Sequence, residues 1–87
     1  MSEKYLVELT SAARKQLQKL DGRTQELILG SLEMLAEVPR PPGAKNLSAR
    51  PGQFRVRVRD FRIIYSVDDG RLLVLVIKIG HRRHVYK

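Results

Sequence analysis

Hydrophobic positions in the first part of the chain have the spacing of one strand followed by two helices. Residues 5–9 (YLVEL) predict a short strand, and Thr10 or Ser11 then offers a side-chain oxygen that can cap a helix. Apolar residues recur at helical spacing after this cap and again from Thr24 to Val38. Asp21-Gly22 interrupts the pattern between them. Because the joining turn is short, the two helices are expected to pack as an antiparallel hairpin.

The second part of the chain changes to the period of strands. Residues 39–52 (PRPPGAKNLSARPG) form a connection too rich in Pro and Gly for regular structure. Gln53–Val58 and Phe61–Val67 then predict two strands joined by a tight turn. After the Asp-Gly turn signal, residues 71–79 (RLLVLVIKI) include a run of six apolar positions. Such a run is typical of a central strand covered on both faces.

These elements predict one α+β domain that spans residues 1–87. The expected order is β-α-α-β-β-β, an antiparallel sheet with an N-terminal helical hairpin packed on one face. The chain has no cysteine, which excludes disulfides and thiolate metal sites and favours the cytoplasm. No apolar run approaches the roughly 18 residues that a membrane helix needs, so no membrane partner is expected.

Charge divides the chain into two unequal parts. Residues 1–43 carry six Lys or Arg and six Asp or Glu, whereas residues 44–87 carry eleven basic and three acidic residues. The second part therefore holds the whole net charge of +8. This segregation favours a polyanionic partner, and RNA or DNA more than a membrane, because the arginines follow strand patterns rather than an amphipathic helix.

The arginines of residues 53–65 (QFRVRVRDFRIIY) fall on one face of the predicted hairpin. A two-residue or four-residue turn at positions 59–60 pairs Arg57 with Arg62 and Arg55 with Ile64. Like charges directly opposite each other are destabilising, so this pattern indicates a function rather than a folding role. The alternative is an exposed face on which arginine stems cover apolar neighbours, and a turn of odd length would change the register.

The last segment, GHRRHVYK, can complete the same cationic surface. Gly80 allows a bend, after which His81, Arg82, His84 and Tyr86 supply hydrogen-bond donors, a titratable group and an aromatic ring. A solvated basic tail is the alternative. The sequence has no metal-ligand spacing, phosphate-binding Gly-rich loop or Ser-His-Asp pattern. An enzyme acting on phosphates would therefore work by cationic stabilisation, proton transfer and positioning, without a cofactor or metal.

At these residues the chain resembles the RelE/ParE superfamily of bacterial toxins, and more closely its RelE-like branch. The similar segments extend over nearly the whole sequence and are YLVELT, ARKQLQKLD, PPGAKNL, FRVRVRDFRIIYSVDD and VLVIKIGHRRHVY. The resemblance implies a toxin of a type II toxin–antitoxin system that enters the ribosomal A site and cleaves mRNA. Cleavage would proceed by attack of the RNA 2′-hydroxyl on the adjacent phosphate. The implied partners are a cognate antitoxin, the ribosome and mRNA, with a toxin–antitoxin complex of higher order as an option.

The resemblance also implies roles for individual residues. Arg62 and Arg82 would hold the scissile phosphate, and Tyr86 would stack on a base or transfer a proton. Well-known members carry Lys where this chain has arginines at positions 55 and 57, and an arginine cannot accept a proton. His81 or Tyr86 then becomes the expected proton acceptor, and His84 is interpreted as structural or solvated. The expected catalytic residues are Arg55, Arg57, Arg62, Arg82, Tyr86 and His81, and the expected RNA-binding residues are Lys45, Arg59 and Arg83.

Two other functions fit the same fold. One is a ParE-like inhibitor of DNA gyrase without nuclease activity, which would not need the arginines and the tyrosine together. The other is a catalytically silent module that binds RNA or the ribosome. The arginines in place of lysine keep this second alternative open.

Overall fold

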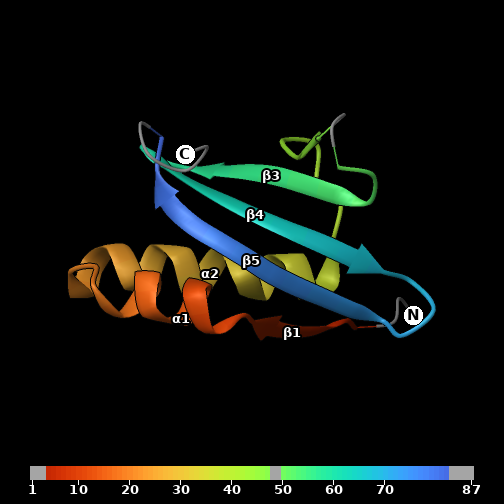
Figure 1. The fold of residues 1–87 in the computed structure, drawn as a ribbon, viewed down its shortest axis with the longest axis horizontal. Coiled ribbons are helices and arrows are strands. Elements are labelled where there is room, and N and C mark those ends of the chain that lie inside the picture. The colour runs from red at the N-terminus through yellow and green to blue at the C-terminus, as the bar shows by residue number, and fades with distance from the viewer. Residues whose placement is uncertain (1–3, 48–49, 83–87) are drawn as a thin grey trace.

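A computed structural model of the chain describes residues 4–47 and 50–82. Its elements form two layers, a pair of helices below one face of a twisted sheet (Figure 1). In chain order they are β1 (Leu6–Leu9), α1 (Ser11–Gln18), α2 (Gly22–Glu37), β2 (Lys45–Asn46), β3 (Gln53–Val58), β4 (Phe61–Asp68) and β5 (Leu73–His81). The expected α+β architecture, with the helical hairpin on one face, is confirmed.

The sheet is mixed rather than fully antiparallel, which corrects the expectation from sequence. Its strand order is β1-β5-β4-β3-β2, and β1 runs parallel to β5 while the other neighbours are antiparallel. The helical hairpin returns the chain to the end of the sheet from which β1 started. Of the four strands that follow, β3 has the direction of β1, and the antiparallel pairings of β3 with β4 and of β4 with β5 give β5 that direction again. The middle strand of the sheet is β4, and β5 lies between β4 and β1.

The Pro- and Gly-rich connection contains regular structure that the sequence did not predict. Lys45 and Asn46 form β2, which pairs with Arg55 and Phe54 of β3. Only two residues take part, so the local composition gives no strand signal. This short edge strand nevertheless brings Lys45 onto the sheet beside the arginines.

Both helices begin at a side-chain cap. The Oγ1 atom of Thr10 accepts a hydrogen bond from the backbone N–H of Ala13 (3.1 Å), and its hydroxyl donates to the carbonyl of Ile77 (2.9 Å). Thr10 thus caps α1 and joins it to β5. Asp21 caps α2 by accepting from the backbone N–H of Thr24 (2.9 Å). The Asp-Gly pair is therefore the start of a helix rather than only a break, because a carboxylate satisfies an otherwise unbonded N–H there.

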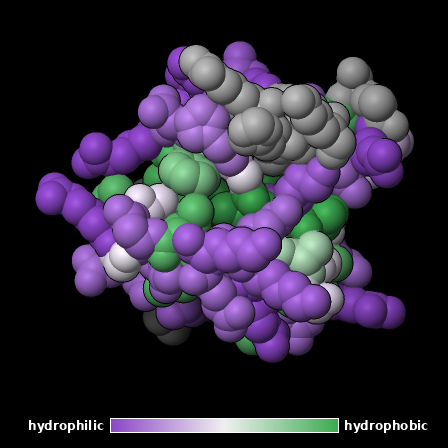
Figure 2. Space-filling model, turned by 60° about the vertical axis from the view of Figure 1, so that its left-hand side comes forward, coloured by the Kyte–Doolittle hydropathy of each residue, from purple (hydrophilic) through white to green (hydrophobic). Residues whose placement is uncertain are grey.

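The core lies between the helices and one face of the sheet. Its members are buried apolar residues from both layers, namely Ala13, Leu17, Ile28, Leu32, Leu35, Ile63, Tyr65, Val74, Val76 and Ile79. On β5 the buried positions alternate with partly buried ones, so its second face is only partly covered, unlike the expectation. Hydrophobic residues also reach the surface between the two layers at the end that holds the β3–β4 turn (Figure 2). No helix of the described residues is long and apolar enough to cross a membrane.

A bulge in β5 decides which residues share the open face of the sheet. Ile64 pairs with Lys78, whereas the next residue of β4, Tyr65, pairs with Val76. Ile77 is therefore left between two register positions. As a result Lys78 stands on the helix-free face, while Val76 and Ile79 both face the core.

Candidate functional site

The β3–β4 hairpin places two arginines directly across from each other. Arg57 on β3 is the register partner of Arg62 on β4, and Arg55 is the partner of Ile64, so the register expected from the sequence is confirmed. The apolar residues that alternate with the arginines on β3 pack toward the core. The arginines therefore occupy the face without helices. Opposed like charges destabilise a sheet, so the hairpin holds a cationic pair that its own folding does not require.

The turn between these strands contains a third arginine in an unfavourable backbone conformation. Arg59 has φ of 55°, in the left-handed region, and its side chain is exposed. A residue with a Cβ atom pays roughly 1–2 kcal/mol for this conformation, and Gly or Asn suits such a turn better. The turn geometry therefore does not explain the arginine. Arg59 lies at the tip of the hairpin, and its expected contact to RNA stays a prediction.

A second row of cations crosses the same face one step away. Lys45 on β2 pairs with Arg55 on β3, which pairs with Ile64 on β4, which pairs with Lys78 on β5. Lys78 was not among the residues expected from sequence. Within Leu73–His81 it is the only charged residue apart from the terminal histidine, and a single lysine in an apolar strand could have marked it as a candidate site residue. The bulge in β5 determines which face of the sheet Lys78 occupies, and the sequence does not predict this bulge.

Arg62 is a cation whose side chain is buried although it lies on the helix-free face of the sheet. It is only 8% exposed, and its Nη1 donates a long hydrogen bond of 3.4 Å to the carbonyl of Phe61. Among residues 4–47 and 50–82, no carboxylate forms an ion pair with it. Burying a charge without an opposite charge is unfavourable. An anion bound beside Arg62 would compensate this cost, and a phosphate matches the guanidinium fork geometrically.

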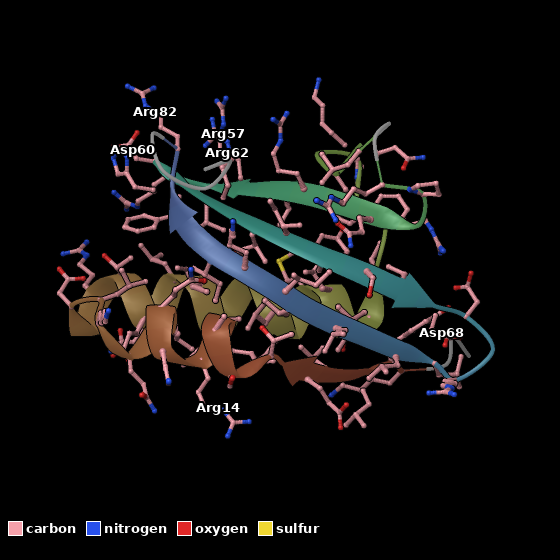
Figure 3. All side chains as sticks on the ribbon, in the orientation of Figure 1. Arg14, Arg57, Asp60, Arg62, Asp68 and Arg82 are labelled. Atoms are coloured by element: carbon pink, nitrogen blue, oxygen red, sulfur yellow. The ribbon has the colours of Figure 1, made fainter. Side chains whose placement is uncertain are left out.

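The backbone after β5 brings Arg82 to the hairpin. The N–H of Arg82 donates to the carbonyl of Asp60 (2.8 Å), which continues the β4–β5 pairing by one step. Strand alternation then assigns Arg82 to the face of Arg62. Figure 3 shows Arg57, Arg62 and Arg82 at the same end of the molecule, on the side of the sheet away from the helices. Residues from opposite parts of the second half of the chain thus meet, as expected.

His81 lies on the other face of the sheet. It is the register partner of Phe61, and the two rings meet edge to face with centroids 5.7 Å apart and an interplanar angle of 78°. Phe61 packs against the core, so the imidazole is on the helix side. The structure therefore does not bring His81 together with Arg57 and Arg62. The other expected residues of the last segment, Arg83, His84 and Tyr86, lie outside the described residues.

A separate polar cluster lies at the turn between β4 and β5, which the sequence did not predict. Arg40 donates two hydrogen bonds to Asp69, Nη1 to Oδ1 (3.1 Å) and Nη2 to Oδ2 (2.9 Å), and the hydroxyl of Tyr5 also donates to Oδ1 (2.5 Å). The hydrogen bonds from Arg40 and then Tyr5 lower the pKa of Asp69. The same bond to Asp69 raises the pKa of Tyr5. The three residues are distant in sequence, so no local pattern reveals them.

The cluster continues into the core through Arg40. Its guanidinium lies over the ring of Phe54, 5.4 Å from the centroid, and this ring stacks on Tyr65 with centroids 5.7 Å apart. The hydroxyl of Tyr65 donates to the carbonyl of Pro39 (2.8 Å), and burial raises the pKa of Tyr65 to about 12. These contacts anchor the connection after α2 onto the sheet. They indicate a structural role for this cluster, which is separate from the arginines of the open face.

The open face can bind and neutralise an anion through its basic side chains. In the described part of the chain no three His, Asp or Glu residues lie together in a way that could hold a metal ion. Guanidinium groups donate to phosphate oxygens and cannot accept protons at ordinary pH. We refer below to the cationic sheet face, which comprises Lys45, Arg55, Arg57, Arg62, Lys78 and Arg82.

Comparison with known proteins gives consistent matches over almost the whole chain. The family model for the ParE toxin of the type II toxin–antitoxin system parDE matches residues 7–86. A RelE-like toxin protein of Escherichia coli is 30% identical over 80 residues, covering 91% of this chain and 84% of that protein. The mRNA interferase toxin RelE of Escherichia coli K12 is 29% identical over 80 residues, covering 90% and 83%. In the crystal structure of the RelBE2 toxin–antitoxin complex from Mycobacterium tuberculosis, a chain matches with a TM-score of 0.81 and 29% identity, over 91% of this chain and 92% of that one.

Proposed function

Because the chain belongs to the ParE toxin family of type II toxin–antitoxin systems and is a RelE-like toxin of the RelE/ParE superfamily, we propose that it is a ribosome-dependent mRNA endonuclease. The observation that carries the proposal is the buried Arg62, which has no acidic partner among the described residues and lies directly opposite Arg57. The name of the related mRNA interferase supports the reaction class. The toxin would act in the cytoplasm, where translating ribosomes present mRNA.

The proposed reaction needs charge stabilisation more than covalent chemistry from the protein. The 2′-oxygen of one nucleotide bonds to the adjacent phosphorus, and the bond from phosphorus to the 5′-oxygen of the next nucleotide breaks. The 2′-hydroxyl gives up a proton, and the leaving oxygen takes one. Negative charge grows on the phosphate oxygens meanwhile, and Arg62 and Arg82 are the groups we assign to stabilise it. Arg55 and Arg57 add positive potential on the same face.

The arginines of the cationic sheet face do not serve as the proton acceptor. These arginines stay protonated, and His81 contacts Phe61 on the opposite face. We therefore assign proton transfer, or stacking on a base, to Tyr86 rather than to His81. Lys45, Arg59 and Arg83 would bind the RNA backbone near the cleaved bond.

A cognate antitoxin would control this activity. The matching Mycobacterium tuberculosis chain comes from a toxin–antitoxin complex, which supports an antitoxin as partner of this chain. The sheet has β1 and β2 as its edge strands, and an edge strand is a place where a partner can add a further strand. A complex of higher order is compatible with two such edges.

Primer extension on an mRNA translated with purified ribosomes tests the proposal. We expect cleavage by the wild-type protein only when ribosomes translate the message, and strong loss for Arg62→Ala and Arg82→Ala. Tyr65→Phe is the matched control, because Tyr65 faces the core and not the cationic sheet face. Equal cleavage by Arg62→Ala and the wild type would disprove the site assignment.

Inhibition of DNA gyrase is the second candidate function. The matching family model describes a ParE toxin, which keeps this candidate open. A supercoiling assay with purified gyrase separates the two: inhibition without mRNA cleavage would replace our proposal. Ribosome binding without either activity would instead indicate the catalytically silent binding module.

A further inference from the structure

A second group of cations lies on the outer surface of α1. One side of this helix faces the sheet. On that side Ala13 and Leu17 are buried, and Gln16 accepts a hydrogen bond from the N–H of Ile79 on β5 (2.8 Å). At helical spacing the opposite arc then holds exposed Arg14, Lys15 and Lys19. We call these three residues the α1 cation stripe.

Among the residues that the structure describes, no acidic side chain forms an ion pair with the α1 cation stripe. The helix sequence SAARKQLQ contains no Asp or Glu. Within the described residues, the ion pairs join Arg40 to Asp69 and Arg71 to Asp68, and none involves the stripe. A helix C-terminus favours cations, which accounts for Lys15 and Lys19 near the end of α1. It does not account for Arg14, in the middle of the helix, or for Lys15 and Lys19 repelling each other at a spacing of four.

The stripe is far from the cationic sheet face. Figure 3 shows Arg14 projecting below the helical layer, whereas Arg57 and Arg82 project above the sheet. This direction is the intermediate axis of the molecule, along which it extends 28 Å. At physiological ionic strength the Debye length is about 8 Å, so charges on the two surfaces are largely screened from each other. The two surfaces therefore act as separate electrostatic sites.

The chemistry of the stripe favours a phosphate backbone over a protein segment. Its arc consists of Ser11, Arg14, Lys15, Gln18 and Lys19, all exposed and without an apolar side chain. A bound peptide helix needs apolar anchors in a groove, and this arc offers none. Lys and Arg on flexible stems suffice for sequence-independent contacts to phosphates. The absence of an aromatic side chain from α1 also argues against stacking on unpaired bases.

We propose that the α1 cation stripe binds the phosphate backbone of ribosomal RNA while the cationic sheet face holds the mRNA. This inference rests on the proposed function, because it assigns the ribosomal contact of the same toxin. The stripe positions the toxin and takes no part in bond cleavage. Removing it should therefore weaken binding to the ribosome without slowing cleavage once the toxin is bound.

Binding to purified 70S ribosomes, measured at several salt concentrations, tests the inference. The variant carries Arg14→Gln, Lys15→Gln and Lys19→Gln, since glutamine preserves helix propensity. The control carries Lys4→Gln, Arg50→Gln and Arg71→Gln, which removes the same charge from exposed residues outside both surfaces. We expect the stripe variant to bind at least about tenfold more weakly than the control, with a salt slope lower by roughly two to three. Its single-turnover cleavage at saturating ribosomes should stay within about twofold of wild type.

Each other outcome points to a different failure. If the wild type binds ribosomes and the stripe variant binds as well as the control, the inference alone is wrong. A stripe variant that keeps its affinity but loses cleavage at saturation also overturns it. If the stripe variant loses affinity for the antitoxin but not for ribosomes, the surface belongs to the antitoxin instead. A wild type that neither binds nor cleaves on ribosomes refutes the proposed function itself, and circular dichroism confirms that each variant is folded.

Discussion

Arg57 and Arg62 are register partners across the β3–β4 hairpin, and they differ sharply in exposure. Arg57 is exposed, whereas Arg62 is 8% exposed and has no acidic partner among the described residues. One member of the pair can therefore adapt to a ligand, while the other is held in place. This combination suits a phosphate site, because the fixed guanidinium is already oriented when the anion arrives.

The repulsion in this pair predicts that removing the exposed partner stabilises the protein. For Arg57→Gln at low salt we expect the free energy of unfolding to rise by about 0.2–1 kcal/mol. The gain should shrink at high salt, because screening already reduces the repulsion. Urea unfolding at low and high salt measures it, with Arg71→Gln as control, since Arg71 faces an acid, Asp68, at 3.7 Å. A loss of stability in Arg57→Gln would show that the opposed arginines do not repel each other in the fold.

Replacing the buried partner should affect cleavage most. For Arg62→Ala we expect the single-turnover cleavage rate on ribosomes to fall by roughly 100- to 1000-fold, the range seen when one charge-stabilising group is removed. Arg62→Lys should lie between this variant and the wild type, because it keeps the charge but loses the two-pronged geometry. Equal rates for the Lys and Ala variants would mean that charge at this position is unimportant.

The separation of His81 from the arginines predicts unequal roles for the two expected proton acceptors. We expect Tyr86→Phe to lower the cleavage rate by about 100-fold or more, in the range of general acid–base contributions. His81→Asn should change the cleavage rate by less than about threefold, because the imidazole ring of His81 contacts Phe61 on the helix side of the sheet. Rate–pH profiles of both variants check the assignment. A large loss in His81→Asn, together with loss of one limb of the rate–pH profile, would assign the proton to the histidine instead.

The hydroxyl of Tyr65 should matter for stability and not for activity. Tyr65→Phe leaves the carbonyl of Pro39 without its 2.8 Å hydrogen bond, which should cost about 1 kcal/mol in urea unfolding. Cleavage should be unchanged. In the wild type, an ultraviolet titration should show one phenol ionising at about 12, as burial raises the pKa of Tyr65. Loss of cleavage with normal stability would place Tyr65 in the functional site.

Asp69 should contribute stability that depends on pH. The hydrogen bonds from Arg40 and Tyr5 lower the pKa of Asp69 in the folded protein below its usual 3.8. The contribution is therefore fully present above pH 3.8 and is lost as the pH falls through the folded value. Asp69→Asn should be less stable than the wild type at pH 7, and the difference should diminish below pH 4. Thermal unfolding at a series of pH values checks this, and a difference independent of pH would contradict it.

The elements set by short-range interactions were accessible from the sequence. The helical hairpin follows from the spacing of apolar residues between Thr10 and Pro39. The register that opposes Arg57 and Arg62 follows from a two-residue turn, since such a turn determines which residues pair. The sequence alone also shows that cations accumulate in the second half of the chain and that the chain resembles RelE-like toxins.

Only the tertiary structure decided the remaining relationships, because each depends on partners far apart in the chain. The parallel pairing of β1 with β5, the two-residue strand β2 and the cluster of Tyr5, Arg40 and Asp69 have no local signature. The β5 bulge moves Lys78 onto the face of Arg55, and alternation beyond it puts His81 on the opposite side from Arg62. The sequence thus determined which residues carry the charge. The packed sheet decided which of them share a face, because a shift of one residue in a strand reverses the direction of every side chain that follows.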